Sequence, residues 1–272
     1  MGCRASFKHA PGAKSELMLK DLGKNIEDFI LRGCLLSCGK FYILKDKEII
    51  MEIKTFHGFE DFCVEKFENT DEWYYGIYPT WMSNVEVAEE CGKGREYAGS
   101  KLCFFNKTGR SYEPIKQEKN VYLEAPVYDK ASNSFGILRY DFNKGILQVI
   151  VYKADEESVE VIEEISLSEI DDLMNIRLIE SPFMIVRNSM EENAIEFLAP
   201  KRKIYLEENE SIEFVENEKM YSSKWKEDSL DVLDYGYGEE VIVRDLETGK
   251  ILERYKGYLN RMPDGTAWLM TE

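Results

Sequence analysis

Histidine is scarce in this sequence of 272 residues, which has two, His9 and His57. No G-x-S-x-G segment accompanies them, so hydrolysis by a serine nucleophile and a histidine base is not expected. The six cysteines include no C-x-x-C pair, and the acidic runs lack the D-x-D-x-D-G order of calcium loops. We therefore expect neither a metal nor a cofactor.

Positive charge is also in short supply. The chain has 35 Lys and Arg against 52 Asp and Glu, which gives a formal net charge of −17. Such a charge repels phosphate backbones and anionic lipids, so we expect no nucleic-acid partner and no membrane surface as partner. A protein or peptide partner with basic groups is compatible with this charge.

Long apolar runs are missing as well. No stretch of 18 apolar residues occurs, and the first 20 residues lack the apolar core of a secretory signal. The cysteine spacing favours free thiols over local disulfides. These features predict a cytoplasmic protein in a reducing compartment.

Aromatic residues, by contrast, are abundant: 16 Tyr, 14 Phe and 4 Trp. Tyrosine, phenylalanine and β-branched residues pack well on pleated sheets, so a β-rich globular fold is favoured. Residues 134–155 contain two apolar runs joined by a tight turn that ends at Gly145. This pattern predicts a β-hairpin.

The hairpin pattern recurs along the chain. Two apolar residues, a cation and an Asp or Asn occur at 137–141 (Ile-Leu-Arg-Tyr-Asp) and again at 185–188, 242–245 and 43–46. The spacing indicates a period of roughly 40 to 50 residues, which is typical of propeller blades with about four strands each. One further unit is expected near Asn84–Glu89, where only an alternating pattern is left.

A second short pattern, Glu-x-Pro, occurs at Glu124–Pro126 and at Glu180–Pro182. Proline lacks a backbone donor and is found at the starts and edges of strands. Each Glu-x-Pro is therefore interpreted as the beginning of the first strand of a blade. Coincidence between two short strings is the alternative.

Residues 239–257, EEVIVRDLETGKILERYKG, resemble the outer hairpin of a WD-repeat blade, in which an Asp precedes a Thr-Gly-Lys turn. Residues 258–270 resemble the first two strands of another blade. The Gly-His opener, the Trp-Asp dipeptide and the kelch Gly-Gly pair are absent, so the resemblance is to β-propeller repeat proteins in general. A propeller must close its ring, since open sheet edges would stay unpaired.

The fold predicted from these features is all-β: a β-propeller of about five blades, or alternatively six, closed by pairing of N-terminal and C-terminal strands. A two-sheet sandwich is the fallback. Residues 1–20 are expected to form a loose arm, and residues 21–272 a single propeller domain. Strands are expected near residues 33–38, 41–45 and 48–54.

The first strand of a propeller blade lines the central channel, so a binding site is expected there. We expect an axial ligand-binding pocket that contains six residues: Glu124, Glu180, Tyr75, Trp81, Arg187 and Arg261. Two carboxylates about 5 to 10 Å apart can act on a glycosidic bond. Equally, each glutamate can pair with a repeat arginine such as Arg139, or face water.

Two functions follow. The first is a binding or scaffold propeller without catalytic residues, which interacts with a protein or peptide. The second is a protein that binds a glycan or a small polar ligand, or a carboxylate-dependent enzyme acting on glycans through the axial pocket. An enzyme is the less favoured of the two, because no catalytic constellation is evident in the sequence.

Overall fold

The structure, a computed structural model, describes residues 53–189, 191–227 and 237–271. The regular structure of the described residues is β-strand, apart from one α-helix and one 3-10 helix. Their strands form four successive antiparallel sheets, which we call blades 1 to 4, and a separate two-stranded hairpin. Together the blades have the arrangement of a β-propeller.

Blades 1 and 2 contain nine strands: β1 (Cys63–Lys66), β2 (Trp73–Tyr78), β3 (Lys101–Asn106), β4 (Ser111–Tyr112), β5 (Val121–Leu123), β6 (Val127–Asp129), β7 (Ser134–Asp141), β8 (Ile146–Lys153) and β9 (Ser158–Ser166). Blade 1 has the order β1-β2-β3-β4. Blade 2 has the order β5-β7-β8-β9, with β6 pairing β7 beyond the end of β5. The helix α2 (Asn84–Gly92) connects β2 to β3, and the 3-10 helix η1 (Leu167–Glu169) follows β9.

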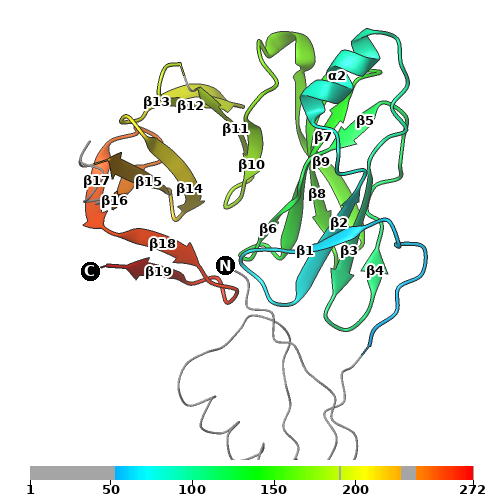
Figure 1. The fold of residues 1–272 in the computed structure, drawn as a ribbon, viewed down its shortest axis with the longest axis horizontal. Helices are drawn as coiled ribbons and strands as arrows, with labels where there is room; N and C mark the ends of the chain where they lie inside the picture. The colour runs from blue at the N-terminus through cyan, green and yellow to red at the C-terminus, as the bar shows by residue number, and fades with distance from the viewer. Residues whose placement is uncertain (1–52, 190, 228–236, 272) are drawn as a thin grey trace, which may run out of the picture. The chain divides into compact units, whose positions relative to one another are not determined.

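Blades 3 and 4 and the C-terminal hairpin contain ten strands: β10 (Ile176–Ile179), β11 (Met184–Ser189), β12 (Ala194–Leu198), β13 (Lys201–Tyr205), β14 (Glu210–Glu216), β15 (Lys219–Glu227), β16 (Tyr237–Asp245), β17 (Ile251–Lys256), β18 (Tyr258–Arg261) and β19 (Ala267–Met270). Blade 3 runs in order from β10 to β13, and blade 4 from β14 to β17. Figure 1 shows β6, β10, β14 and β18 around a common central region.

The hairpin predicted at residues 134–155 is confirmed as β7 and β8. Its turn closes with a hydrogen bond from the Gly145 amide to the Asp141 carbonyl, 2.8 Å long, and Gly145 has a φ of 67°. The hairpin predicted at residues 239–257 is also confirmed, as β16 and β17, the two outer strands of blade 4.

Three aromatic and aliphatic cores lie between consecutive blades. Ile137 belongs to the core between blades 1 and 2, whereas its neighbour Leu138 belongs to the core between blades 2 and 3. Likewise Ile185 and Val186 of β11 face different cores. Neighbouring strand residues point to opposite faces, so a strand buried on both sides needs two consecutive apolar residues. This explains the repeated apolar pair.

The cation after the apolar pair is held across the sheet. Arg139 donates to Oε1 of Gln148 at 2.8 Å, and Arg187 donates from Nε to Oε2 of Glu196 at 2.8 Å. The third copy of the pattern is different: Arg244 lies on β16, the third strand of its blade and not the second. The repeat inferred from residues 242–245 was therefore out of phase with the others.

The unit expected near Asn84–Glu89 is wrong, because this segment is helix α2. Ser83 caps the helix by accepting from the Glu86 amide, and the Glu86 carboxylate accepts from the Ser83 amide. This reciprocal pair is a capping box, which starts a helix efficiently. The alternation came from Val85 and Val87, of which Val87 is fully buried.

The Glu-x-Pro interpretation is also wrong. Glu124 follows β5 and begins the break between β5 and β6, whereas Glu180 follows β10 in the turn to β11. Both lie after the start of the first strand. The two positions are not equivalent, so the similarity between the two short strings does not mark the same point of a repeat.

A feature that does mark blades 2 to 4 is a residue in the left-handed conformation just before the first strand. Asn120, Asn175 and Asn209 precede β5, β10 and β14 with φ of 58°, 57° and 60°. Gly257 precedes β18 with φ of 110°. Asparagine and glycine tolerate this conformation best. The hairpin β18–β19 thus begins in the same way as blades 2 to 4.

The parts of the fold prediction that concern the N-terminus lie outside the described residues. These are the loose arm at 1–20 and the strands near 33–38 and 41–45, with most of 48–54. Contacts divide the chain into residues 1–53 and 54–272, and the second unit is the one described above. Four blades are seen in the described residues, so a fifth blade and closure of the ring stay predictions.

Candidate functional site

The turns that lead from the first to the second strand of each blade converge on one cavity of about 600 Å³. Asn69 comes from blade 1, Asp129 and Lys130 from blade 2, and Ser181 from blade 3. Ala131 and Pro182 belong to the same turns of blades 2 and 3. The remaining walls are formed by the ends of β14 and β18, by the turns that follow them and by one residue after β16: Val215, Glu216, Asn217, Glu218, Arg261, Gly265 and Leu246. We call this the loop cavity.

Asp129 holds two of these turns together. It is 8% exposed and accepts hydrogen bonds from the Ser181 hydroxyl at 2.7 Å and from the Ala131 amide at 3.2 Å. The Ser132 hydroxyl and amide donate to the same carboxylate. Burial raises the pKa of Asp129, but the hydrogen bonds outweigh burial and hold the pKa below its ordinary value. Asp129 is therefore ionised and fully occupied.

Ser181 has a φ of 63°, which is unusual for a residue other than glycine, asparagine or aspartate. Its hydroxyl reaches the Asp129 carboxylate from this backbone conformation. Strained backbone persists only where surrounding contacts fix it, and it is concentrated at ligand sites. The sequence marked Ser181 only as the middle of a Glu-x-Pro string.

Arg261 and Glu180 form an ion pair at the wall of the loop cavity. Glu180 is 8% exposed, and the Arg261 guanidinium lies 5.0 Å from the centre of the Phe214 ring on β14. The pair connects the C-terminal hairpin to blades 3 and 4. Two of the six predicted site residues are thus brought together, as a charge pair of the kind considered in the sequence.

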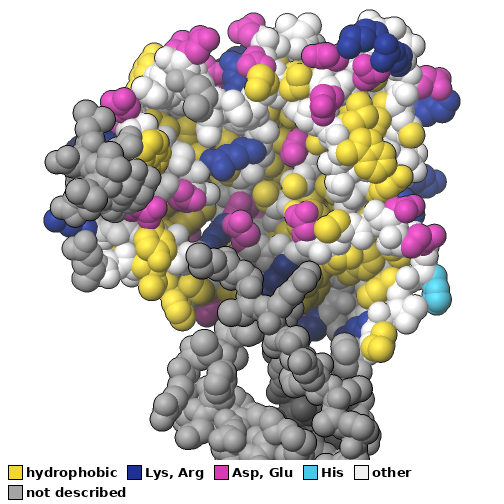
Figure 2. Space-filling model, viewed as in Figure 1, with side chains coloured by type: hydrophobic (Ala, Val, Ile, Leu, Met, Phe, Trp, Pro, Cys, Tyr) yellow, Lys and Arg dark blue, Asp and Glu magenta, His cyan; other side chains and the backbone are white. Residues whose placement is uncertain are grey.

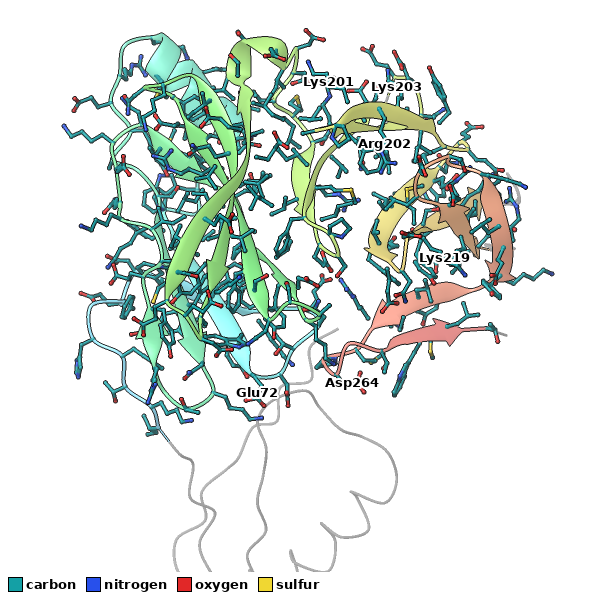
Figure 3. All side chains as sticks on the ribbon, turned by 180° about the vertical axis from the view of Figure 1, so that it is seen from behind. Glu72, Lys201, Arg202, Lys203, Lys219 and Asp264 are labelled. Atoms are coloured by element: carbon teal, nitrogen blue, oxygen red, sulfur yellow. The ribbon has the colours of Figure 1, made fainter. Side chains whose placement is uncertain are left out.

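The tip of the C-terminal hairpin contacts blade 2. The Lys130 ammonium donates to the Asp264 carbonyl, and Thr266 closes the tip by donating its amide to Asp264 Oδ1 at 2.9 Å. Gly265 has a φ of 83°, and a Cβ there would lie 2.8 Å from Lys130 Nζ. Figure 3 shows Asp264 at this tip. The hydrogen bond directs the Lys130 ammonium at the backbone of the hairpin.

Arg177 on β10 is a further cation in this region. Its Nη2 donates to the Ile212 carbonyl at 2.5 Å, while its buried Nε has no hydrogen-bond partner among the described residues. Burial lowers the pKa of Arg177, and the charges of Glu213, Glu180 and Glu68 act against this. The first strands of blades 3 and 4 are thus joined by a partly desolvated guanidinium.

Glu124 and Tyr75 lie in a different place from the loop cavity. Burial raises the pKa of Glu124, and the Ala125 amide, which donates to it, opposes this. Tyr75 donates to Glu65 at 2.7 Å; burial raises the pKa of Tyr75, as do this bond and the charges of Glu65, Glu68 and Glu124. The charge of Glu124 thus acts on Tyr75, whereas the hydrogen bond of Tyr75 goes to Glu65.

Trp81 and Arg187 are not brought to either group. Trp81 is 66% exposed and packs edge-on against Tyr78, with ring centroids 5.2 Å apart. Arg187 is held by Glu196 and by the Asp172 carbonyl, the latter at 3.0 Å. A ligand-binding role for the six residues remains a prediction. Trp73 and Tyr75 of the same aromatic stretch pack against the core between blades 1 and 2.

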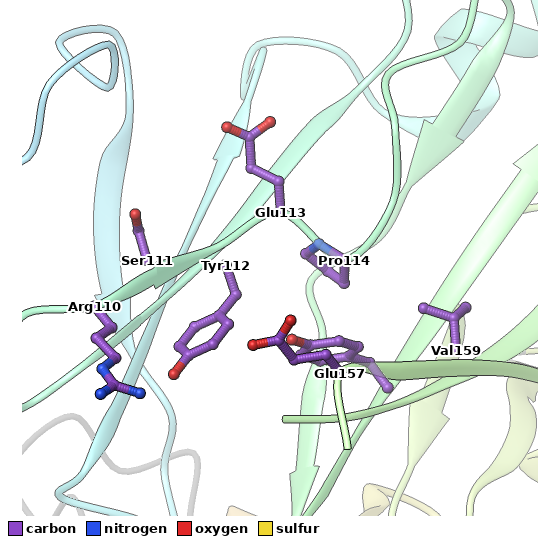
Figure 4. A pocket seen from close by; sticks show the side chains of 8 residues that line it. Arg110, Ser111, Tyr112, Glu113, Pro114, Glu157 and Val159 are labelled. Carbon is purple, nitrogen blue, oxygen red and sulfur yellow. The ribbon is translucent and has the colours of Figure 1, made fainter. Parts of the chain in front are cut away.

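Two other cavities lie at the outer strands. One, of about 570 Å³, is enclosed by Arg110 to Pro114, around β4, and by Tyr152, Glu157 and Val159. Figure 4 shows the Tyr112 and Glu157 side chains facing each other across it. The other, of about 370 Å³, contains Glu163 to Ile165 of β9 and the turn from Leu198 to Lys201. We call these the first and second outer cavities.

The basic triplet Lys201–Arg202–Lys203 lies on strand β13, as Figure 3 shows, and each of its members has a contact. Lys201 pairs with Glu169 at 3.0 Å, and Lys203 pairs with Glu196 at 2.8 Å. The Arg202 guanidinium lies 3.9 Å from the centre of the Phe197 ring. The three basic side chains thus have structural contacts around β13.

Within the described residues, no group of three or more His, Cys, Asp and Glu side chains is placed to hold a metal ion. None of the helices in the same residues has the length and apolar character needed to cross a membrane.

Comparisons with known proteins give similarity in fold only. No family model matches the sequence, and no curated protein matches it. Among solved structures, the β-propeller domain of the Trilobed protease from Pyrococcus furiosus is similar over 73% of this chain and 57% of that one, with 13% identity and a TM-score of 0.39. TolB from Acinetobacter baumannii is similar over 61% of this chain and 41% of that one, with 10% identity and a TM-score of 0.34. The chain thus spans less than two thirds of either, and the β-propeller arrangement itself is established by the sheet order described above.

Proposed function

We propose that this chain is a binding module that engages a protein or peptide partner through the loop cavity. The observation that carries the proposal is the convergence of the first turns of all four blades, and of the C-terminal hairpin, on that cavity. A rigid scaffold that presents loops around a hollow is a common way to build a binding site.

The charges around the loop cavity favour a basic group on the partner. Lys130 donates to the Asp264 carbonyl, and Arg261 is paired with Glu180. Glu216 and Glu218, in contrast, are exposed on the β14–β15 turn, and the structure shows no ion pair from either to a described cation. A lysine or arginine side chain of the partner would find two carboxylates there. The net charge of −17 acts in the same direction at long range.

A short probe tests the proposal. The capped tripeptide Ala-Arg-Ala is titrated into the isotope-labelled full chain, with capped Ala-Glu-Ala as the matched probe of opposite charge. We expect the arginine probe alone to shift the amide resonances of 129–131 and 216–218. The Glu216→Gln/Glu218→Gln variant should lose these shifts, and the Glu191→Gln/Glu208→Gln variant, with the same charge change at exposed turns, should keep them. Equal shifts with both probes would contradict the proposal.

The second candidate, a glycan or small polar ligand bound or cleaved near the axis, is favoured by one observation. Glu124 is a partly buried carboxyl whose pKa is raised by burial, as a general acid requires. Its test is a Glu124→Gln variant assayed on a panel of aryl glycosides. If the unchanged chain hydrolyses a glycoside and the Glu124→Gln variant does not, this candidate is favoured over the first.

We also propose that β18 and β19 are the first two strands of a fifth blade, which residues 41–45 and 48–54 complete and so close the ring. The support is the left-handed Gly257 before β18, the arrival of the β18–β19 turn at the loop cavity, and the exposure of Trp268 and Met270. Hydrogen exchange tests it. Paired amides on both edges of β19 should be protected in the full chain, and deletion of residues 1–53 should abolish protection on one edge. Fast exchange there in the full chain would exclude closure.

A further inference from the structure

The outermost strand of blade 2 has an open edge. β9 pairs with β8 along its length, and no other described strand pairs with it. It is nine residues long, and Val159, Val161 and Ile162 are 48%, 48% and 45% exposed. An open strand edge presents a row of unpaired backbone groups that a further strand can use.

The two outer cavities lie on opposite faces of this strand. Val159, which is part of the first outer cavity, pairs with Tyr152, whose ring is in the core facing blade 1. Glu163 and Ile165, in the second outer cavity, pair with Val149 and Leu147, which face blade 3. Ile162 is the extra residue of a β-bulge between these two halves, and it changes which face the alternating side chains occupy.

The spacing suits one extended chain. From Val159 to Ile165 a strand rises by about 20 Å at about 3.3 Å per residue. Successive side chains of an added strand point to opposite faces, so one strand paired along β9 would direct a side chain into each cavity. Each cavity also presents more carboxylates than cations: Glu113 and Glu157 with Arg110 at the first, and Glu163, Glu164 and Glu169 with Lys201 at the second, where Lys201 pairs with Glu169.

The charges decide which occupant fits. Glu160 and Glu163 form no ion pair with a cation in the described residues, and Glu164 accepts a hydrogen bond from Gln148 at 2.8 Å. A second copy of the chain paired edge to edge would place these carboxylates against one another, which is unfavourable. A segment in which basic and apolar residues alternate would instead match both the glutamates and the exposed valines.

We propose that the edge of β9 binds an extended, basic segment of a partner protein as an added strand, with one side chain in each outer cavity. Recognition of this kind takes its affinity from backbone hydrogen bonds and its selectivity from pockets for alternate side chains. The site is distinct from the loop cavity, and the proposal does not depend on the function proposed for that cavity.

The test uses fluorescent peptides of about ten residues, long enough to span β9, and the full chain. The probe alternates lysine and valine. One matched peptide replaces lysine with glutamate, and another carries two adjacent prolines at its centre, which cannot complete a ladder of backbone bonds. We expect the lysine peptide to bind and to protect β9 amides from hydrogen exchange, and both matched peptides to bind at least about tenfold more weakly.

Variants locate the binding. Glu160→Lys/Glu163→Lys should weaken binding of the lysine peptide by about tenfold or more, whereas Glu191→Lys/Glu208→Lys, with the same change in net charge, and Glu216→Lys/Glu218→Lys at the loop cavity should change it less than about twofold. If Glu160→Lys/Glu163→Lys lowers the melting temperature of the chain, the milder Glu160→Gln/Glu163→Gln variant is used in its place. Undiminished binding of the proline peptide, or equal losses in all three variants, would overturn the proposal. The proposal would also be overturned if the chain self-associates and the Glu160→Lys/Glu163→Lys variant does not.

Discussion

The Ser181 hydroxyl donates a hydrogen bond to Oδ1 of Asp129 at 2.7 Å and so connects the turns of blades 2 and 3. The carboxylate that accepts it is almost fully buried and has its other partners in its own turn. A single ionised group therefore fixes the wall of the loop cavity. Its charge gives the contact a pH dependence that can be measured.

We expect Asp129→Asn to destabilise the chain by about 1.5 to 3 kcal/mol at neutral pH, as is usual for hydrogen bonds to a charged group. The pKa of Asp129 is lower in the folded chain than in the unfolded chain, so its contribution is present above the unfolded value and is lost as the pH falls through the folded value. The variant should therefore be less sensitive to acid below about pH 4. Urea unfolding at several pH values measures both effects, with Asp155→Asn as the control, and equal acid sensitivity of Asp129→Asn and the unchanged chain would contradict the expectation.

Glu124 should give the free energy of unfolding a pH dependence of the opposite sign. Because burial raises its pKa in the folded chain, the folded state holds its proton more tightly, and stability falls as the pH rises from the unfolded towards the folded value. Glu124→Gln should therefore be more stable than the unchanged chain at pH 7, and the difference should disappear below about pH 4. Thermal unfolding across this range is the measurement. A variant that is less stable at pH 7 would show that the carboxylate has favourable partners.

The buried ion pair of blade 4 provides a third test. Arg244 donates to Glu210 through Nε at 2.8 Å and Nη2 at 2.6 Å, and Ser222 donates to the same carboxylate. Both side chains are almost completely buried. Glu210→Ala should cost about 3 to 5 kcal/mol, since it leaves Arg244 as an unpaired buried charge.

The control for this prediction is an exposed pair of the same kind, Lys119 and Glu96, 2.8 Å apart. Glu96→Ala should cost less than about 1 kcal/mol. Chemical unfolding of the two variants under one set of conditions gives the comparison. Similar losses in both would mean that burial does not determine the cost of breaking the pair.

Gly257 offers a fourth test, on the C-terminal hairpin. A Cβ at this position would lie 1.9 Å from the Met270 carbonyl, and the φ of 110° is unfavourable for any other residue. Gly257→Ala should displace β19 and alter the fluorescence of Trp268. Gly145→Ala, where a Cβ meets no atom within 4 Å, should show only the cost of its positive φ, about 1 to 2 kcal/mol. Trp268 fluorescence that is the same in both variants would contradict this.

Sequence patterns predicted the sheets better than the site. The 134–155 hairpin and the 239–257 hairpin were recognisable because their apolar alternation and glycine turns are local features. The segment at Asn84 failed because Val85 and Val87 alternate as they would in a strand, while Ser83 and Glu86 form a capping box. Here the local cap decided the structure, and the alternation did not.

The loop cavity could not be predicted in the same way. Its walls come from turns that are distant in sequence, and the contact between Asp129 and Ser181 spans 52 positions. Glu180 and Arg261 were singled out separately, but their pairing depends on the position of the C-terminal hairpin. One useful sign was present in the sequence: an asparagine before each of three first strands, at 120, 175 and 209.

The second strand of an interior blade has one face in each of two adjacent cores, as Ile137 and Leu138 show for β7. Removing such a strand would expose apolar surface on both neighbours at once. Each described blade therefore depends on its neighbours for burial of its apolar faces. Heat or denaturant should unfold the described blades in a single cooperative transition, without blade-by-blade intermediates.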